Sequence, residues 1–298
     1  MISKKTEILA DISLAVMALI WGASFVVMKN SLDVFTTLQI LAIRMALGAA
    51  VLAIACFKTM KKIKPKDFIG GFIVGVMLFG GFYFQTIGLE ISTVGNSSFL
   101  TATYVIMIPF FLFVFFKKKP DIYNVSSAIL TVVGIFFLTG AGFSLNLALG
   151  DIYTLIGSVF FALHIILVGK FSKQSNPIIL TVLQLMFTSI ISFVLMIFTE
   201  PLQITITTST IMPLLYLGIV GSGVAFLIQN VAQQYSPPTH AGIIMSLESV
   251  FATTLGVIFL KEAMTSGTII GASIIFLALV IAESKLSFLK KKNPTLKS

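Results

Sequence analysis

Long uncharged apolar stretches alternate along the chain with short segments that carry lysine and proline. Phe68 to Leu89 has 22 residues without Asp, Glu, Lys or Arg, Ile91 to Phe116 has 26, and Ala263 to Ala282 has 20. A helix needs about 20 apolar residues to cross the hydrocarbon core of a bilayer, which is about 30 Å thick. The pattern therefore predicts a bundle of membrane-spanning helices.

Apolar stretches that end at charged residues or prolines predict ten spans in all. They lie at residues 10–29, 37–57, 68–89, 94–116, 122–142, 150–170, 177–198, 211–233, 240–260 and 265–284. The eighth span ends before Pro237 and Pro238, which together remove two backbone donors. The first apolar segment, Ile12 to Met28, lacks a small-residue cleavage site and is expected to stay as an uncleaved anchor.

The composition also indicates that the chain is embedded in a lipid bilayer. Hydrophobic residues make up 57% of the 298 positions and charged residues 10%, against about 25% charged in soluble domains. Cys56 is the only cysteine, which excludes an internal disulfide, a cysteine zinc cluster and a CxxC redox site. No GxxxxGK[ST] phosphate-binding loop occurs. We therefore expect no cofactor, no metal site and no direct coupling to ATP hydrolysis.

The distribution of lysine predicts the orientation of the spans. With a cytoplasmic N-terminus, 17 of the 20 basic residues fall in cytoplasmic loops or tails, while Lys29 and Lys261 fall on the other side and Arg44 within a span. Cationic loops translocate poorly. We therefore expect both termini in the cytoplasm of a multi-pass inner or plasma membrane protein. The net charge of +9 then reflects orientation and contact with anionic lipid, not binding of nucleic acid.

An internal repeat relates the two halves of the chain. The third to fifth spans align without a gap on the eighth to tenth at an offset of 144 residues, which pairs Gln85 with Gln229. Because five spans are an odd number, the second unit enters the membrane from the opposite side. Inverted repeats are a recurrent transporter architecture, with the substrate site between the units. The sequence thus predicts an all-α membrane protein of two inverted five-helix repeats, residues 1–145 and 146–298, the second with a basic tail.

Several short motifs, in this order, resemble those of a known transporter family. They are Trp21-Gly22-Ala23-Ser24-Phe25, Arg44, Tyr104-Val105-Ile106-Met107-Ile108-Pro109, Ser246-Leu247-Glu248-Ser249-Val250-Phe251, Leu260-Lys261-Glu262 and Gly271. Over about residues 10 to 284 the chain resembles the ten-helix EamA-type exporters of the drug/metabolite transporter superfamily. The resemblance implies a central cavity among helices 1, 3, 4, 6, 8 and 9, with helices 5 and 10 as support. The chain departs from the family at Ser249, where proline is frequent, and at Lys261, where glycine is common.

Polar side chains inside the spans are the candidates for a functional site. A charged side chain such as Arg or Asp costs about 2.5–3.5 kcal/mol at a helix centre, so polar groups in a span usually face water or a partner. Glu248 is the leading candidate, either to take a proton or bind a substrate ammonium group, or as a structural carboxylate. His164 is interpreted as a proton relay or a neutral packing residue. Arg44 is predicted to fix the bundle, with an ion pair to Glu248 as an open alternative.

The other candidates are aromatic, hydroxyl and amide side chains. Trp21, Tyr83 and Tyr104 are expected to line the cavity for an apolar or cationic ligand, or else to serve in packing. Gln85 and Gln229 are favoured among the amides because symmetry-related positions flank one central site. The complete expected lining is Glu248, Trp21, Ser24, Tyr83, Gln85, Tyr104, His164 and Gln229, and the expected structural or gating residues are Arg44, Gln184 and Glu262.

These features favour a secondary transporter over an enzyme. The hypothesis is export of small organic metabolites, such as amino acids and related solutes, or of drugs, by alternating access. Protons are a candidate coupling ion, and facilitated diffusion is equally consistent. We expect a small-molecule substrate, a lipid environment and a monomer or weak dimer. One alternative is an uptake permease. The other is an intramembrane enzyme that acts on a lipid, and the scattered acids and the distance in sequence between His164 and His240 disfavour this enzyme.

Overall fold

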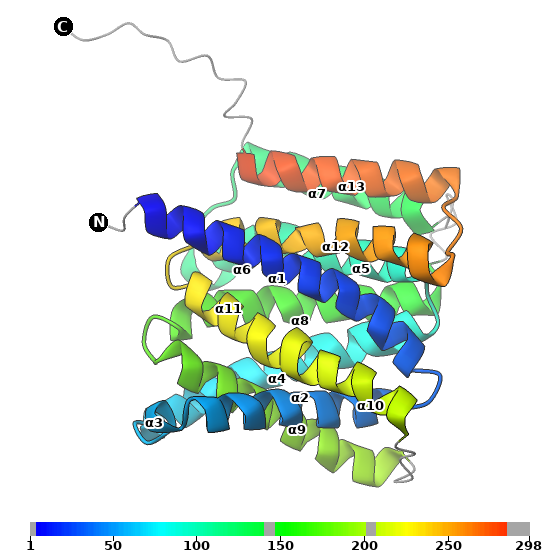
Figure 1. Cartoon of the computed structure of the whole chain (residues 1–298). Coiled ribbons are helices and arrows are strands. Elements are labelled where there is room, and N and C mark those ends of the chain that lie inside the picture. Colours follow the sequence, from blue (N-terminus) through cyan, green and yellow to red (C-terminus); the bar gives the residue numbers. More distant parts are fainter. Residues whose placement is uncertain (1–3, 140–146, 201–206, 285–298) are drawn as a thin grey trace, which may run out of the picture.

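The computed structural model describes residues 4–139, 147–200 and 207–284, and these residues form helices and no strands. The first half contains α1 (Lys4–Ser31), α2 (Thr37–Ala55), α3 (Phe57–Met60), α4 (Pro65–Glu90), α5 (Val94–Ala102), α6 (Tyr104–Phe116) and α7 (Ile122–Thr139). The second half contains α8 (Leu149–Phe171), α9 (Pro177–Thr199), α10 (Thr208–Leu215), the π-helical segment η2 (Tyr216–Val224), α11 (Ala225–Ala232), α12 (Pro238–Leu260) and α13 (Ser266–Ser284). The long helices lie roughly side by side in one bundle (Figure 1).

The described helices account for the ten predicted spans. Nine segments are long and apolar enough to cross a membrane, and a tenth apolar helix, Ser266–Ile281, is shorter. Short helices combine to make two of the spans: α5 with α6, and α10 with η2 and α11. The prediction of a multi-pass, all-α membrane protein is confirmed.

Polarity is distributed as a lipid solvent requires. Large apolar side chains cover the outside of the bundle, for example Ile54 at 77%, Val132 at 66% and Phe198 at 80% exposed. The charged side chains of Arg44 and Glu248 are instead buried inside. Within a bilayer, polar groups gain by facing the bundle interior, where they find partners or water.

Equivalent helices of the two halves pack against each other. Helix α2 packs on α9, and α7 packs on α13; these two pairs lie at opposite edges of the bundle in Figure 1. Other helix contacts occur in pairs: the second contact of each pair joins the helices that are equivalent to those of the first, with the two halves exchanged. Helix α4 packs on α9 as η2 packs on α2, and α1 packs on α12 as α8 packs on α5 and α6. A two-fold axis between the halves produces this arrangement, and the predicted inverted repeat is confirmed.

The ends of α6 and α12 show the repeat at single residues. Lys117 and Lys261, 144 positions apart, are the only non-glycine residues in the described chain with positive φ, at 57° and 54°. In each case the next N–H, of Lys118 or Glu262, donates to the carbonyl six residues earlier at 3.4 Å. Both helices therefore close with the same left-handed turn. This conformation favours glycine, which accounts for the glycine usual at position 261 in the family that the sequence resembles.

Charged side chains at the loop faces satisfy the ends of helices. Glu262 accepts the backbone N–H groups of Val94, at 2.7 Å, and Gly95, at 3.2 Å, at the start of α5. Lys29 donates to the carbonyls of Leu89, Glu90 and Ser92, at 2.8, 2.9 and 2.9 Å, at the end of α4. The first backbone N–H groups and the last carbonyls of a helix have no partner inside it. Glu262 thus caps the start of α5.

Two interruptions of the helices do not follow the repeat. The fourth span breaks at Thr103, whose hydroxyl donates to the Leu100 carbonyl at 2.6 Å and to Ser158 Oγ of α8 at 3.2 Å. The eighth span contains η2, where Ser222 Oγ donates to the Leu217 carbonyl at 2.8 Å. π-Helical turns occur frequently at functional sites. Both interruptions lie beside the centre of the bundle, where the halves meet.

Candidate functional site

A cavity lies at the centre of the bundle, between the two halves. Its lining comes from α1, α2, α4, α5, α6, α8, α11 and α12, and in the described chain neither α7 nor α13 contributes. The lining residues are Trp21, Ser24, Phe25, Met28, Arg44, Phe82, Gln85, Leu89, Thr101, Tyr104, Phe161, His164, Ile165, Phe226, Gln229 and Glu248. The free volume is about 40 Å³, room for a few water molecules.

Helical spacing explains which side chains reach the cavity. On α1 the lining residues are Trp21, Ser24, Phe25 and Met28, which follow the i, i+3, i+4, i+7 pattern of one helix face. Phe82, Gln85 and Leu89 on α4, and Phe226 and Gln229 on α11, are likewise three or four positions apart. The lining is therefore one stripe from each of several helices.

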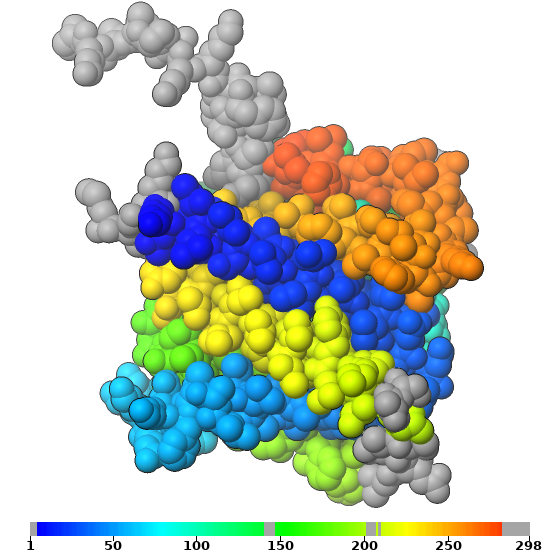
Figure 2. Space-filling view, in the orientation of Figure 1, coloured from blue at the N-terminus to red at the C-terminus, as the bar shows by residue number. Residues whose placement is uncertain are grey.

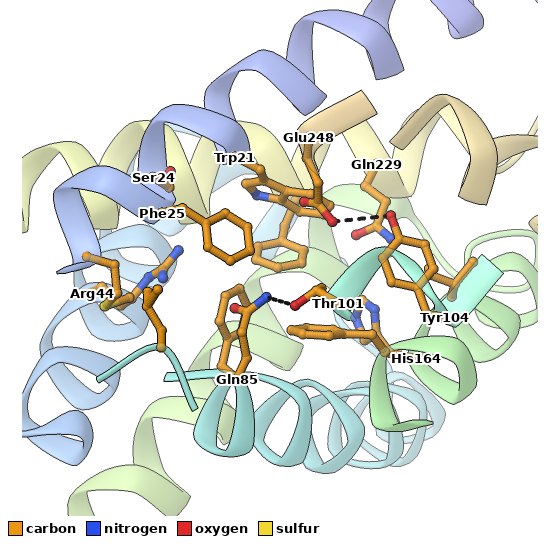
Figure 3. Close-up of a pocket in the computed structure, with 16 residues that line it drawn as sticks. Trp21, Ser24, Phe25, Arg44, Gln85, Thr101, Tyr104, His164, Gln229 and Glu248 are labelled. Carbon is orange, nitrogen blue, oxygen red and sulfur yellow. Dashed lines mark hydrogen bonds between the residues drawn. The ribbon is translucent and has the colours of Figure 1, made fainter. Parts of the chain in front are cut away.

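The cavity lies on the two-fold axis that relates the halves. Phe82 and Phe226, 144 positions apart, meet edge to face with ring centroids 5.9 Å apart. Tyr104 and Glu248 are also 144 positions apart, and the Tyr104 hydroxyl donates to Glu248 Oε1 at 3.3 Å. Equivalent residues can touch each other only close to the axis. The contact between Tyr104 and Glu248 thus places the candidate carboxylate at the centre of the molecule (Figure 3).

The two predicted glutamines both line the cavity but differ in their partners. Gln85 donates through Nε2 to Thr101 Oγ1 at 3.0 Å. Gln229 is 1% exposed, and neither its amide nitrogen nor its amide oxygen has a hydrogen-bond partner among the described residues. A buried amide without partners is costly unless water or a ligand satisfies it. Gln229 therefore offers an amide NH2 group as donor and an amide oxygen as acceptor to whatever occupies the cavity.

His164 and Trp21 are held in place by neighbours on other helices. His164 Nε2 lies 3.0 Å from Gln184 Oε1, which links two predicted residues and gives Gln184 a positioning role. Trp21 donates its indole N–H to the Gly221 carbonyl of η2 at 3.0 Å and packs on Phe226 at 5.1 Å between ring centroids. The π-helical segment thus supplies an acceptor that fixes the one tryptophan at the cavity.

Arg44 lies at the other end of the cavity from Glu248 (Figure 3). Its Nε donates to Ser222 Oγ at 2.9 Å, and its guanidinium carbon lies 4.6 Å from the centroid of the Phe82 ring. Its Nη2 has no partner among the described residues. The possible ion pair with Glu248 is not formed, since in the described chain the one salt bridge joins His240 to Asp11.

The cavity includes most of the lining residues expected from the sequence, together with others that were not expected. Seven of the eight predicted lining residues contact the cavity, and Tyr83 does not. Tyr83 stacks instead on Phe79, with ring centroids 5.4 Å apart, because one residue turns a helix by about 100° away from Phe82. The residues that were missed are Phe25, Met28, Phe82, Leu89, Thr101, Phe161, Ile165 and Phe226. The repeat offset of 144 that pairs the glutamines also pairs Phe82 with Phe226.

Comparison with known proteins settles the family. A model of the EamA-like transporter family matches residues 8–140 and matches again at residues 148–283. The chain belongs to this family. The two EamA matches fall on the two halves of the bundle.

Relatives of this EamA-like protein cover nearly its whole length. An Archaeoglobus fulgidus protein named as an uncharacterized transporter is 35% identical over 93% of this chain and 86% of its own. Protein PecM of Dickeya dadantii is 24% identical over 92% of each chain. A crystal structure with 16% identity superimposes with a TM-score of 0.71, over 97% of this chain and 100% of the other, and shows the same fold. The protein is thus a membrane transporter of small solutes and not an enzyme.

Proposed function

We propose that this EamA-like protein is a secondary transporter that exports small organic metabolites, such as amino acids and related solutes, or drugs. The observation that carries the proposal is the cavity on the two-fold axis, because both halves supply its polar lining. Glu248 and Gln229 come from the second half, and Gln85, Tyr104 and Arg44 from the first. A site shared equally by two inverted units is one that their relative motion can expose to either side.

The two halves are packed unequally, which supports alternating access. Near the face opposite the N-terminus, α4 and α8 touch at Gly88 and Gly150, where a Cβ on Gly150 would lie 2.8 Å from the Gly88 carbonyl. The equivalent place in the other half, between α1 and α11, has Leu9 and Ala232 and is hollowed by a groove of about 240 Å³. On the side of the bundle turned to the viewer in Figure 2, α1 runs between the α10–α11 segment and α12. The tight interface between α4 and α8 closes the face opposite the N-terminus. When α1 and α11 adopt the tight packing, and α4 and α8 the looser one, the N-terminal face is closed instead.

We propose that Glu248 binds the coupling proton or an ammonium group of the solute. In the described chain it is the one carboxylate that lines the cavity, and it is 4% exposed. A carboxylate held by a tyrosine hydroxyl at the axis can exchange that hydrogen bond for a substrate donor as the halves move. Export by proton antiport follows if proton and solute use the carboxylate in turn.

We propose that the N-terminal face of the bundle is cytoplasmic, in the inner or plasma membrane, and that the protein acts as a monomer or weak dimer. Helix α1 begins and α13 ends on the same side (Figure 1). That side also carries the lysine-rich segment around Lys58 and Lys62 between α2 and α4. Retention of positive loops in the cytoplasm supports this orientation.

Counterflow in proteoliposomes tests the proposed function. Vesicles that hold the purified protein are loaded with one amino acid or quaternary amine, and exchange of external labelled solute is followed. We expect saturable, solute-specific exchange, and an imposed pH gradient should drive accumulation against the solute gradient. Empty vesicles and vesicles of heat-denatured protein are the controls. Absence of exchange for every solute in the panel would refute the proposal, and exchange that is indifferent to the pH gradient would favour facilitated diffusion.

A further inference from the structure

Arg44 is a buried cation without a carboxylate partner. It is 1% exposed, and within the described residues no Asp or Glu oxygen lies within 4.0 Å of its guanidinium. Ser222 holds Nε, Phe82 covers the guanidinium face, and Nη2 has no partner. A Cβ built on Gly221 of η2 would lie 3.7 Å from that nitrogen. One terminal donor of a fixed, planar cation is therefore left without an acceptor at the cavity.

Packing of the bundle does not require the charge at this position. The equivalent residue of the second half is the neutral Gln184, 140 positions later. The helices approach in the same manner at both places: a Cβ on Gly218 would lie 3.2 Å from the Arg44 carbonyl, and one on Gly75 would lie 2.9 Å from the Gln184 carbonyl. A glutamine thus satisfies the same backbone packing. Burial of an arginine without a counterion is costly, so the charge calls for an acceptor from outside the protein.

We propose that Arg44 is the anion subsite of the transport cavity and that the solute is a zwitterion. Its carboxylate would bind the free edge of Arg44, and its ammonium group would bind Glu248 at the opposite end of the cavity (Figure 3). Guanidinium groups match carboxylates in geometry and form strong charge-assisted hydrogen bonds with them. Gln229 adds a neutral donor and acceptor beside the Glu248 end. This assignment rests on the proposed transport function and names the charge pattern of its substrate.

The apolar lining fits the rest of such a solute. Phe25, Met28, Leu89 and Ile165 line the cavity and supply no hydrogen-bonding side-chain group apart from the weak acceptor sulfur of Met28. Two charged side chains in a cavity with apolar walls select a small molecule that carries both charges and also has an apolar body. Solutes with one charge alone would leave either Arg44 or Glu248 without its partner.

Fluorescence of Trp21 provides a direct binding assay. Trp21 is the only tryptophan of the chain and lines the cavity. The probes are L-leucine, L-methionine, L-threonine and L-phenylalanine, each compared with its methyl ester and its decarboxylated amine. For the wild-type protein we expect a saturable change with at least one free amino acid, and binding of its ester and amine at least about 10-fold weaker, since both lack the carboxylate.

Variants of Arg44 assign this preference to the guanidinium. Arg44→Gln should bind the free acid as weakly as the ester, Arg44→Lys should keep part of the preference, and Lys58→Gln, an exposed lysine outside the cavity, should change nothing. Size-exclusion and thermal unfolding profiles establish that each variant folds. If Arg44→Gln does not fold, the comparison of acid, ester and amine with the wild type and with Arg44→Lys still tests the anion subsite.

Two results would overturn the anion subsite while leaving transport intact. One is equal binding of acid, ester and amine by the wild type. The other is an unchanged preference for the acid in folded Arg44→Gln. Failure of all the amino acids to bind, together with counterflow of some other solute, would overturn the proposal that the solute is a zwitterion. Absence of counterflow for every solute is the distinct result that refutes the proposed function.

Discussion

Glu248→Gln is expected to abolish transport driven by a pH gradient and to lower counterflow about 30-fold or more. Glutamine keeps the size of the side chain but carries neither the charge nor an exchangeable proton. Loss of one charged partner in a buried hydrogen-bonded pair costs about 2 kcal/mol or more, which corresponds to about 30-fold in affinity. Gradient-driven uptake and counterflow of the same solute, measured on the same vesicles, separate the two effects.

Tyr104→Phe is the matched control for the carboxylate. It removes only the hydroxyl that donates to Glu248 Oε1 at 3.3 Å and leaves the aromatic ring in the lining. We expect a loss in counterflow of about 10-fold or less, because a hydrogen bond to a charged group contributes about 1.5 kcal/mol at this length, and the pH gradient should still drive transport. Gradient-driven transport by folded Glu248→Gln at the wild-type rate would eliminate the proposed role of the carboxylate.

Gly88→Ala is expected to destabilise the closed packing of α4 on α8 and to reduce transport at least about 10-fold. A Cβ on Gly88 would lie 2.6 Å from the Gly150 carbonyl and 2.9 Å from the Thr154 nitrogen, and it would also collide with Thr154 Oγ1. Two of these neighbours are backbone atoms of α8, so the helices must separate. Overpacking of this kind costs about 1–3 kcal/mol. Thermal unfolding in detergent and counterflow rates measure the two effects.

Gly95→Ala supplies the matched control, because the same methyl group finds room there. A Cβ on Gly95 would lie 3.6 Å from Thr253 and 3.8 Å from Glu262, which is ordinary contact. Alanine is also a better helix former than glycine, so this variant should be as stable as the wild type or slightly more stable. Equal stability and transport in both variants would show that tight closure of α4 on α8 is not part of the transport cycle.

The spans and the repeat could be predicted because each depends on local or periodic features of the sequence. Uncharged runs of more than 20 residues have one stable conformation in a bilayer, since a helix satisfies all its backbone groups internally. A constant offset across three spans predicted that Gln85 and Gln229 share one site. The same offset pairs Tyr104 with Glu248, and these two residues are in contact in the structure.

The interruptions of the helices and the partners of Arg44 could not be predicted in this way. At the break, Thr103 contacts Ser158, 55 positions later, and the π-helical segment itself contains no proline. Arg44 was expected to fix the bundle, and its partners Ser222 and Phe82, which lie on two other helices, were not foreseen. The partners of Thr103 and Arg44 come from distant segments of the chain, and hydrophobic periodicity does not predict such tertiary contacts.

Access to Ser24 from the two faces tests the central claim that the cavity is reached alternately from both sides. In a Cys56→Ser background, which has no other cysteine, Ser24→Cys in the cavity lining is treated with a membrane-impermeant thiol reagent in right-side-out and inside-out vesicles. Lys62→Cys and Asn96→Cys, in loops or helix ends at opposite faces, are the controls and should react from one side each. We predict that Ser24→Cys reacts from both sides and that a transported solute protects it from both. Reaction from one side only, with both controls behaving as expected, would contradict alternating access through this cavity.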